Sequence, residues 1–351
     1  MNETPANQKT PTIIPIAGGK GGVGKSLIAA NLAIVLARLG HKTIGIDLDL
    51  GAANLHSCLG LSGGTPPGMA RFLRSTDQAP LESYLARTPH RNLHLLAGDE
   101  GNPFLTQLNV AQQRRLVQQI RALPAEYVIL DLGAGSSFST LDFFRIAHKG
   151  LLVTTPEITS LQNLMNFLKN LAFRVIEHAL PQDRSVHRKL QTLYASPLEL
   201  KSHQPNLLES FLSSLDPKIV EKVLSSWHQF RPRLVFNRGL GPDDLSMIPE
   251  LETHLRHQLD LTGEFIGDSP EDHAVLNSLR QGRSLMSFAS TSNAGQDMIR
   301  LARRVLRLWD QPIPNSARQL QQYTQRLYPE SSLQRLYSTG ESQLHSTCLK
   351  A

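Results

Sequence analysis

The chain has 351 residues and a formal net charge of +6, with 40% hydrophobic and 19% charged residues. This composition is typical of a globular protein with a sizeable core, and the mild positive charge permits nucleic acid or lipid headgroups as partners without indicating either. The two cysteines, Cys58 and Cys348, lie too far apart in sequence for a metal or redox motif. Because the polar start lacks a secretory signal and no apolar run reaches the ~18 residues of a membrane span, we expect a soluble cytoplasmic protein.

Short apolar runs rich in β-branched residues alternate with helix-length segments along most of the chain. The first strand is predicted over residues 12–17, followed by a helix over 26–39 that Gly40 ends. Further strands are predicted over residues 43–48, 93–97, 127–132, 151–155, 233–237 and 264–267. The alternation predicts a three-layer α/β fold with a mostly parallel central sheet and helices on both faces. Pro15 removes a ladder donor from the first strand, so we expect pairing to begin after it or a local irregularity there.

The alternation lapses over residues 174–231, where the periodicity is helical and no clear strand intervenes. We interpret this stretch as a helical insertion within one domain that covers residues 12–310, after a flexible N-terminus over 1–11. A last helix is predicted over 294–310. Its polar face carries four arginines, Arg300, Arg303, Arg304 and Arg307. Residues 311–351, rich in Gln, Ser and Arg, are predicted to form a partly disordered tail.

The strongest motif is GKGGVGKS, residues 19–26, which fits the phosphate-loop pattern G-x-x-x-x-G-K-[ST]. Its glycines let backbone N–H groups turn toward phosphate oxygens, and the following helix adds its positive end. Lys25 is suited to neutralise the β and γ phosphates, and the Ser26 hydroxyl to bind Mg²⁺. The motif follows a predicted strand and opens a predicted helix, as it must. The predicted nucleotide-binding residues are Gly19, Gly21, Gly22, Val23, Gly24, Lys25, Ser26 and Leu27.

Carboxylates follow two other predicted strands. Asp131 comes after four apolar residues and precedes Gly133 and Gly135, which suits a carboxylate near a nucleotide-bound metal. Asp47 and Asp49 alternate along the end of another strand, so one can support the metal and the other can address the attacking water. The plain alternatives are a helix-capping role for Asp131 and solvated turn positions for the other two.

These motifs together resemble the MinD/ParA family of ATPases with a deviant Walker A loop. The resemblance covers about residues 12–310 and is closest for the MinD-like subgroup of flagellar-number regulators, FlhG and FleN. It runs through six blocks in the family's order: KGGVGKS, IDLDLGAANL, LDLGAG, TTPEITSLQN, FNR and GDSPEDHAVLNSLRQG. Six ordered blocks are far more specific than a phosphate loop alone.

The resemblance implies an ATP- and Mg²⁺-dependent homodimer with slow, partner-stimulated hydrolysis. In the family, a residue matching Lys20 reaches across the dimer to phosphates bound by the other subunit, which the charge of two facing ATP molecules makes reasonable. Asp49 matches the residue that positions water, and Asp131 the one that holds Mg²⁺ through water. The resemblance also places base recognition at Asn237, with Arg238 beside it, and at the loop of Pro270, Glu271 and Asp272. Strand-end and loop-forming roles are the plain alternatives for these residues.

Two departures from the family are visible, Asn163 and His56, both at positions where relatives often carry Asp. For Asn163 we expect either a missing salt bridge or a replacing hydrogen bond. For His56 we favour a solvated loop position over a pH-sensitive one.

The sequence leaves several functions open. We favour a dimerisation switch in polar organisation or in flagellar number and placement, with a regulatory protein partner. One alternative is a DNA-partitioning ATPase that binds non-specific DNA through the arginines near residue 304. Another is a metabolic ligase or amidase on the same fold, which no additional nucleophile supports. Residues 317–328 form a narrow amphipathic stripe, for which we favour partner docking or loose order over membrane contact.

Overall fold

The structure, a computed structural model, describes residues 10–61, 68–75, 79–98, 108–195, 207–239 and 246–328. A sheet of eight strands runs through it in the order β3-β4-β2-β5-β1-β6-β7-β8. The strands are β1 (Thr12–Ala17), β2 (Thr43–Leu48), β3 (Ala86–Arg87), β4 (Leu93–Leu96), β5 (Tyr127–Leu132), β6 (Leu151–Thr154), β7 (Arg233–Gly239) and β8 (Glu264–Pro270). All neighbouring strands pair in parallel except β3 and β4, which are antiparallel. The predicted α/β fold with a mostly parallel sheet is therefore confirmed.

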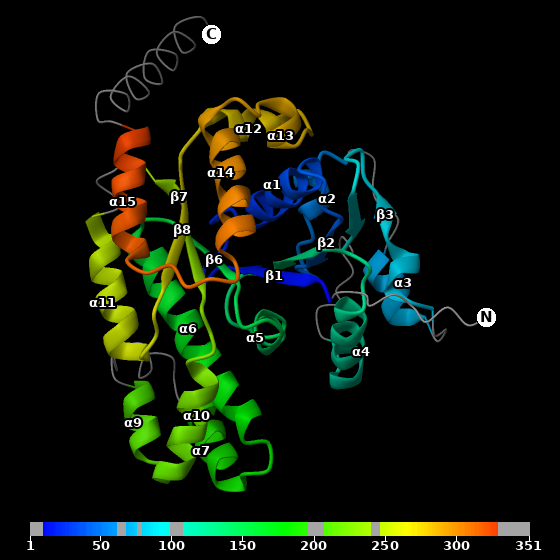
Figure 1. Cartoon of the computed structure of the whole chain (residues 1–351). Helices are drawn as coiled ribbons and strands as arrows, with labels where there is room; N and C mark the ends of the chain where they lie inside the picture. The colour runs from blue at the N-terminus through cyan, green and yellow to red at the C-terminus, as the bar shows by residue number, and fades with distance from the viewer. Residues whose placement is uncertain are drawn as a thin grey trace, which may run out of the picture.

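Helices build one apolar core on each face of the sheet (Figure 1). The helices of the first core are α1 (Lys25–Arg38), α2 (Leu55–Cys58), α12 (His273–Arg280), α13 (Leu285–Phe288) and α14 (Asn293–Leu308). Those of the second core are α3 (Gly68–Arg74), α4 (Val110–Arg121), α5 (Phe138–Phe144), α6 (Ile158–Ala179), α7 (Arg184–Ala195), α9 (Leu207–Ser213), α10 (Pro217–Trp227), α11 (Ile248–Leu259) and α15 (Ser316–Leu327), with the short 3₁₀ helix η1 (Leu81–Tyr84) beside α3 and α4.

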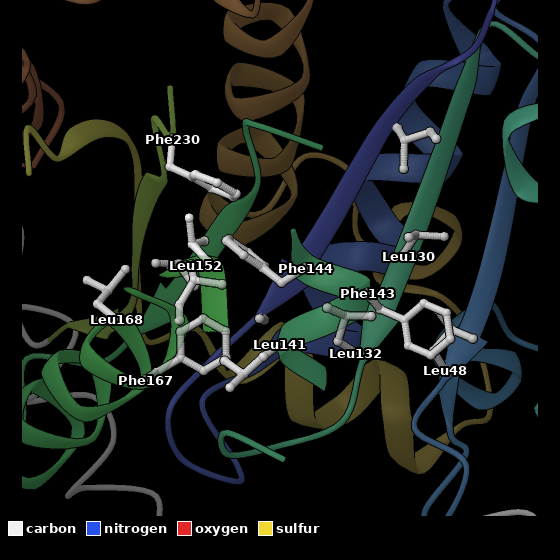
Figure 2. Packing of buried hydrophobic residues seen from close by; sticks show 14 of the residues in the cluster. Leu48, Leu130, Leu132, Leu141, Phe143, Phe144, Leu152, Phe167, Leu168 and Phe230 are labelled. Carbon is white, nitrogen blue, oxygen red and sulfur yellow. The ribbon is translucent and has the colours of Figure 1, made fainter. Parts of the chain in front are cut away.

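Successive side chains of β1 point to opposite faces of the sheet, so the strand contributes residues to both cores. Ile14 and Ile16 belong to the core that contains α1, whereas Ile13 and Ala17 belong to the core that contains α5 and α6. Figure 2 shows how aromatic rings from α5 and α6 fill the second core against β5 and β6, with Phe144 meeting Phe167 edge to face at 5.4 Å. The result is a strand buried on both faces, as its uninterrupted apolar sequence predicts.

Pro15 affects only one side of its strand. Toward β5, β1 pairs without interruption from Thr12 through Pro15 and on to Ile16. Toward β6, pairing begins at Ile16, directly after the proline. The expected late start is thus confirmed for the β6 neighbour, because only one edge of the strand needs the donor that proline lacks.

The stretch over residues 174–231 is helical in its described parts, where no strand occurs. It contains the end of α6 together with α7, α9 and α10, which lie together at the far end of α6 in Figure 1. Helix α10 packs on α6, and the Trp227 indole N–H donates a 2.7 Å hydrogen bond to the Leu259 carbonyl of α11. These contacts tie the helices to the second core, and we propose that they are an insertion within one domain.

The predicted tail begins with a packed helix rather than a loose segment. Helix α15 lies against β8 and α11, and Leu320 is 2% exposed. The Ser316 hydroxyl accepts the Phe265 N–H at 3.0 Å, and the Tyr328 hydroxyl contacts both carboxylate oxygens of Asp297 at 2.9 Å. The expectation of docking or loose order over 317–328 is corrected accordingly: the stripe packs against the body of this chain. Residues 329–351 lie outside the described part.

None of the helices that the structure describes is both long and apolar enough to cross a bilayer.

Candidate functional site

The phosphate loop lies between β1 and α1, and its backbone leaves room for an anion. Gly22 and Gly24 take φ values of +80° and +94°, which side chains disfavour. Helix α1 starts at Lys25 with no side-chain cap and no acidic residue in its first turn. Its first N–H groups and its positive end are therefore not neutralised by a capping side chain or an acidic residue in that turn, which is the arrangement that binds phosphate.

Two neighbouring elements hold this loop in place. A Cβ at Gly19 would lie 2.2 Å from the carbonyl oxygen of Asn163 in α6, so the loop passes directly against that helix. The Gly135 N–H, from the loop after β5, donates to the Gly18 carbonyl at 3.2 Å. The loop is thus mechanically coupled to α6 and to the segment that follows Asp131.

Asp131 is fully buried at the end of β5, and neither of its carboxylate oxygens has a hydrogen bond of good geometry. Burial, then the negative charge of Asp47, raises the pKa of Asp131 to about 8, although the nearby Ser26 hydroxyl and Lys25 ammonium act in the opposite direction. A buried acceptor without partners is costly unless a ligand satisfies it. Oxygen donors from Asp131 and Ser26 are those that Mg²⁺ prefers, so the residues present fit this cation when phosphates complete its coordination. In the described part, no three His, Cys, Asp or Glu side chains form a metal cluster by themselves.

Asp47 and Asp49 differ in what they already contact. Asp47 is fully buried; one oxygen accepts the Asp49 N–H at 3.1 Å, and the other accepts the Leu55 N–H at 3.0 Å. These bonds shape the turn after β2 and give Asp47 a structural task, and its expected support of the metal stays a prediction. The Asp49 side chain lies beside Gly133, where a Cβ would come within 3.2 Å of its Oδ1 atom. Asp49 therefore faces the loop that follows Asp131.

Lys20 does not enter the cradle that its own loop forms. Its ammonium donates to the Glu157 carboxylate at 2.9 Å and to the Thr159 hydroxyl at 3.1 Å, both at the start of α6. The lysine and glutamate side chains are 40% and 56% exposed. The second lysine is thus held at the surface of the molecule, whereas Lys25 is buried.

The residues expected around the base are largely satisfied by protein contacts. The Asn237 amide donates to the Val23 carbonyl at 2.8 Å, so one of its two N–H groups supports the phosphate loop. Asp272 caps α12 through Ala274 and accepts the Ala294 N–H of α14 with its other oxygen. Pro270 ends strand β8 and is not part of a loop, which corrects the expected assignment.

Arg238 and Glu271 are the exposed members of this group. Arg238 has a left-handed backbone with φ of +59°, and its side chain reaches the Gly22 carbonyl at 3.5 Å and Glu271 at 3.9 Å. Both side chains are about half exposed. They form a rim beside the phosphate loop on the side of β7 and β8.

Several contacts at the site were not anticipated from sequence. Glu157 and Thr159, the partners of Lys20, lie in the TTPEITSLQN block, where an acidic residue before a helix was a usable signal. The Asn163 amide donates a hydrogen bond to the Thr159 carbonyl at 2.7 Å, one turn earlier in α6. His56 is 7% exposed in α2, so the solvated interpretation is wrong. Leu55 and Cys58 of the same short helix are buried as well, whereas Ser57 is exposed.

Comparison with known proteins agrees with this geometry. A family model described as the CobQ/CobB/MinD/ParA nucleotide binding domain matches residues 14–325. The chain belongs to this family. The resemblance inferred from the six blocks is therefore confirmed.

Individual relatives carry related names. The antiactivator FleN of Pseudomonas aeruginosa is 30% identical over 191 residues, which are 51% of this chain and 66% of FleN. The septum site-determining protein MinD of Synechocystis is 34% identical over 152 residues, 43% of this chain and 56% of MinD. A putative MinD of Oltmannsiellopsis viridis is 33% identical over 157 residues, 44% of this chain and 48% of that protein. The chain spans about half the length of most of the curated relatives it matches.

Solved structures confirm the fold. MinD of Pyrococcus horikoshii, complexed with Mg-ADP, matches with a TM-score of 0.53 and 20% identity over 86% of this chain and 98% of its own. A putative plasmid partition protein of Borrelia burgdorferi bound to AMPPNP matches with a TM-score of 0.52 and 17% identity, over 85% and 99% of the two chains.

Proposed function

We propose that this chain is a Mg·ATP-dependent dimerisation switch with slow ATPase activity that positions cellular structures, at a cell pole or in the control of flagellar number. The observation that carries the proposal is the pair of lysines in one phosphate loop. Lys25 is buried at the start of α1, whereas Lys20 is held outside the loop by Glu157 and Thr159. A cation kept outside its own cradle is available to phosphates bound by a second copy.

The residues divide the work as follows in this proposal. Backbone N–H groups of the loop and the Lys25 ammonium bind the phosphates, while Ser26 and Asp131 hold Mg²⁺, the latter through water. Mg²⁺ supplies charge neutralisation at the phosphate oxygens. Asp49 orients the attacking water from its place beside Gly133. Lys20 leaves Glu157 and neutralises phosphate charge in the partner subunit. Asn237 supports the loop, and Arg238 and Glu271 border the base.

Dimerisation follows from charge. Two facing nucleotides bring much negative charge together, and a lysine from each subunit offsets part of it. Cleavage of the terminal phosphate removes the contacts that favour the dimer, so the two nucleotide states differ in assembly. A regulatory protein that stimulates hydrolysis would then set the lifetime of the dimer. The cytoplasm, with recruitment to a pole or to the inner face of the membrane, is the location that this proposal implies.

The DNA-partitioning alternative loses part of its expected basis. Arg300 pairs with Asp297 at 2.7 Å, and Arg304 donates to the Ile266 carbonyl at 2.9 Å and lies over the Tyr323 ring. Of the four arginines, only Arg303 and Arg307 are exposed, and the other two are partly buried. Two cations on one helix face are a weak footprint for DNA. No described feature favours a ligase or an amidase.

Binding of a fluorescent ATP analogue and phosphate release test the enzymatic part of this proposal. We expect Lys25→Ala to weaken binding about 100-fold, since it removes a buried charge contact of a few kcal/mol. Asp49→Ala should bind normally and release no phosphate above background. Normal hydrolysis in Asp49→Ala, or unchanged binding in Lys25→Ala, would contradict the assignment.

A further inference from the structure

A groove of about 440 Å³ lies between α4 and the pair α5 and α6, away from the phosphate loop. Figure 1 shows these helices on the same side of the sheet. Four arginines line the groove against a single carboxylate, Asp142. The arginines are Arg114, Arg121, Arg145 and Arg174. The groove is therefore strongly basic, although the nucleotide site makes no use of it.

The one carboxylate is already neutralised. Arg174 donates two hydrogen bonds to Asp142, of 2.8 and 2.6 Å. Arg145 donates a third at 3.1 Å, and the His178 Nε2 atom lies 3.1 Å from the same carboxylate. A further nitrogen of Arg174 bonds to Glu177 at 2.6 Å, so its charge is also spent within the protein. The positive charge left for a ligand belongs to Arg114 and Arg121, which are exposed at the rim of the groove.

Helix α4 presents a regular pattern along this groove. Val110, Arg114, Val117 and Arg121 recur at spacings of four, three and four, so they form one stripe of alternating apolar and basic side chains. Val110 is 63% exposed, so its apolar side chain is accessible to a ligand in the groove. The opposite face of α4 is fixed by core residues such as Leu116, which is fully buried. The stripe is thus held in position before any ligand arrives.

We propose that this groove binds an acidic amphipathic helix of a partner protein. A helix laid along α4 would place apolar side chains against Val110, Val117 and the partly buried Ile146. Its acidic side chains, at the same spacings, would meet Arg114 and Arg121. Nucleic acid fits less well, because its phosphates would leave the exposed Val110 side chain without an apolar contact.

The groove also adjoins the loop that follows Asp131. The Arg174 guanidinium lies 4.8 Å from the centre of the Phe138 ring, at the first residue of α5, and the Asn170 amide donates to Ser136 at 2.8 Å. A helix bound on the groove therefore contacts the elements that carry the loop beside Asp49. The binding itself does not depend on the proposed nucleotide chemistry.

Fluorescence anisotropy with a labelled peptide tests the proposal on the full chain. The probe is a short helical peptide of Glu, Leu and Ala with leucines and glutamates at the spacings of the α4 stripe. We expect the double variant Arg114→Glu/Arg121→Glu to bind it at least about tenfold more weakly than the wild type. Val110→Asp, which leaves all arginines in place, should also weaken binding.

The matched control is Arg303→Glu/Arg307→Glu on α14, which changes the net charge equally at another exposed surface. It should leave peptide binding within about twofold of the wild type. Equal losses in both double variants would show general charge attraction and overturn the proposal, as would no binding to the wild type. Duplex DNA that binds in place of the peptide, and is lost in the groove variant alone, would assign the groove to nucleic acid instead. Circular dichroism confirms that each variant is folded.

Discussion

Two buried acidic side chains, Asp131 and Asp142, have very different surroundings in this protein. Asp131, at the nucleotide edge, is fully buried and has no hydrogen bond of good geometry, whereas Asp142, in α5, accepts from Arg174, Arg145 and Gln113 and lies 3.1 Å from His178. Burial would raise the pKa of both. At Asp142 the bonds from His178 and Arg174 and the charge of Arg174 outweigh burial and hold the pKa well below its usual range. We interpret the buried carboxyl without protein partners as part of a ligand site, and the fully paired carboxylate as a structural contact between helices.

The largest expected effect is on the paired carboxylate. Asp142→Asn should lower the free energy of unfolding at pH 7 by about 3 kcal/mol, because it leaves Arg174 buried beside a neutral group. Since the folded-state pKa of Asp142 is depressed, its stabilisation is complete above the unfolded pKa of ~3.9 and is lost as pH falls through the folded value. Urea unfolding from pH 7 downward should therefore show the wild type and variant converging below about pH 4. A difference in unfolding free energy between wild type and variant that stays constant with pH would contradict this account.

The matched change at the unpaired carboxylate should have the opposite sign. Because burial raises the pKa of Asp131 to about 8, the nucleotide-free protein must bind a proton there at pH 7 or bury the ionised carboxylate. Asp131→Asn removes this cost, so we expect the nucleotide-free protein to gain about 1 to 3 kcal/mol of unfolding free energy. The same variant should lose the stabilisation that Mg·ATP gives to the wild type. Thermal unfolding with and without Mg·ATP measures both. A variant less stable than the wild type in the absence of nucleotide would show that Asp131 has a structural partner after all.

A smaller effect is expected at the base side, where contacts are already satisfied. Asn237→Ala removes the hydrogen bond to the Val23 carbonyl. Because that bond contributes ~1 kcal/mol, the variant should bind both ATP and GTP about fivefold to tenfold more weakly. Competition binding with the two nucleotides measures the ratio of the ATP and GTP affinities in the variant and in the wild type. If only ATP binding falls, Asn237 reads the adenine and is more than a support of the loop.

The smallest effect concerns the exposed pair that holds Lys20. Glu157→Gln should leave the unfolding temperature unchanged, because both side chains are substantially exposed. It should strengthen ATP-dependent dimerisation roughly threefold, since Lys20 no longer has to leave a carboxylate. Sedimentation over a range of concentrations measures the dimer constant. A weaker dimer would mean that Glu157 assists assembly.

The sequence predicted the nucleotide edge well because local rules decide it. The bounds of β1, β2 and β5 follow directly from their apolar runs, and the turn of Gly22 and Gly24 follows from the motif. The remote contacts could not be read in this way. Whether Lys20 meets Glu157, or Asn237 meets Val23, depends on how α6 and β7 pack beside the loop, and nothing in the local pattern encodes that distance.

The same limit explains the two clearest corrections. His56 lies in a short polar-looking stretch, yet the packing of α2 against α1 buries it. The stripe of α15 is narrow enough to suggest a free amphipathic helix, but β8, as the edge strand of the sheet, and α11 provide the surface that covers it. Periodicity shows that a face is apolar and leaves open what it packs against.

The central claim is that ATP, and not ADP, brings two copies together through Lys20. Light scattering should give the molar mass of Asp49→Ala with Mg·ATP and with Mg·ADP, beside the double variant Asp49→Ala/Lys20→Ala. We predict a dimer for the single variant with Mg·ATP. The single variant with Mg·ADP and the double variant with either nucleotide should be monomers. A single variant that remains monomeric with Mg·ATP, or a dimer that persists without Lys20, would contradict the account.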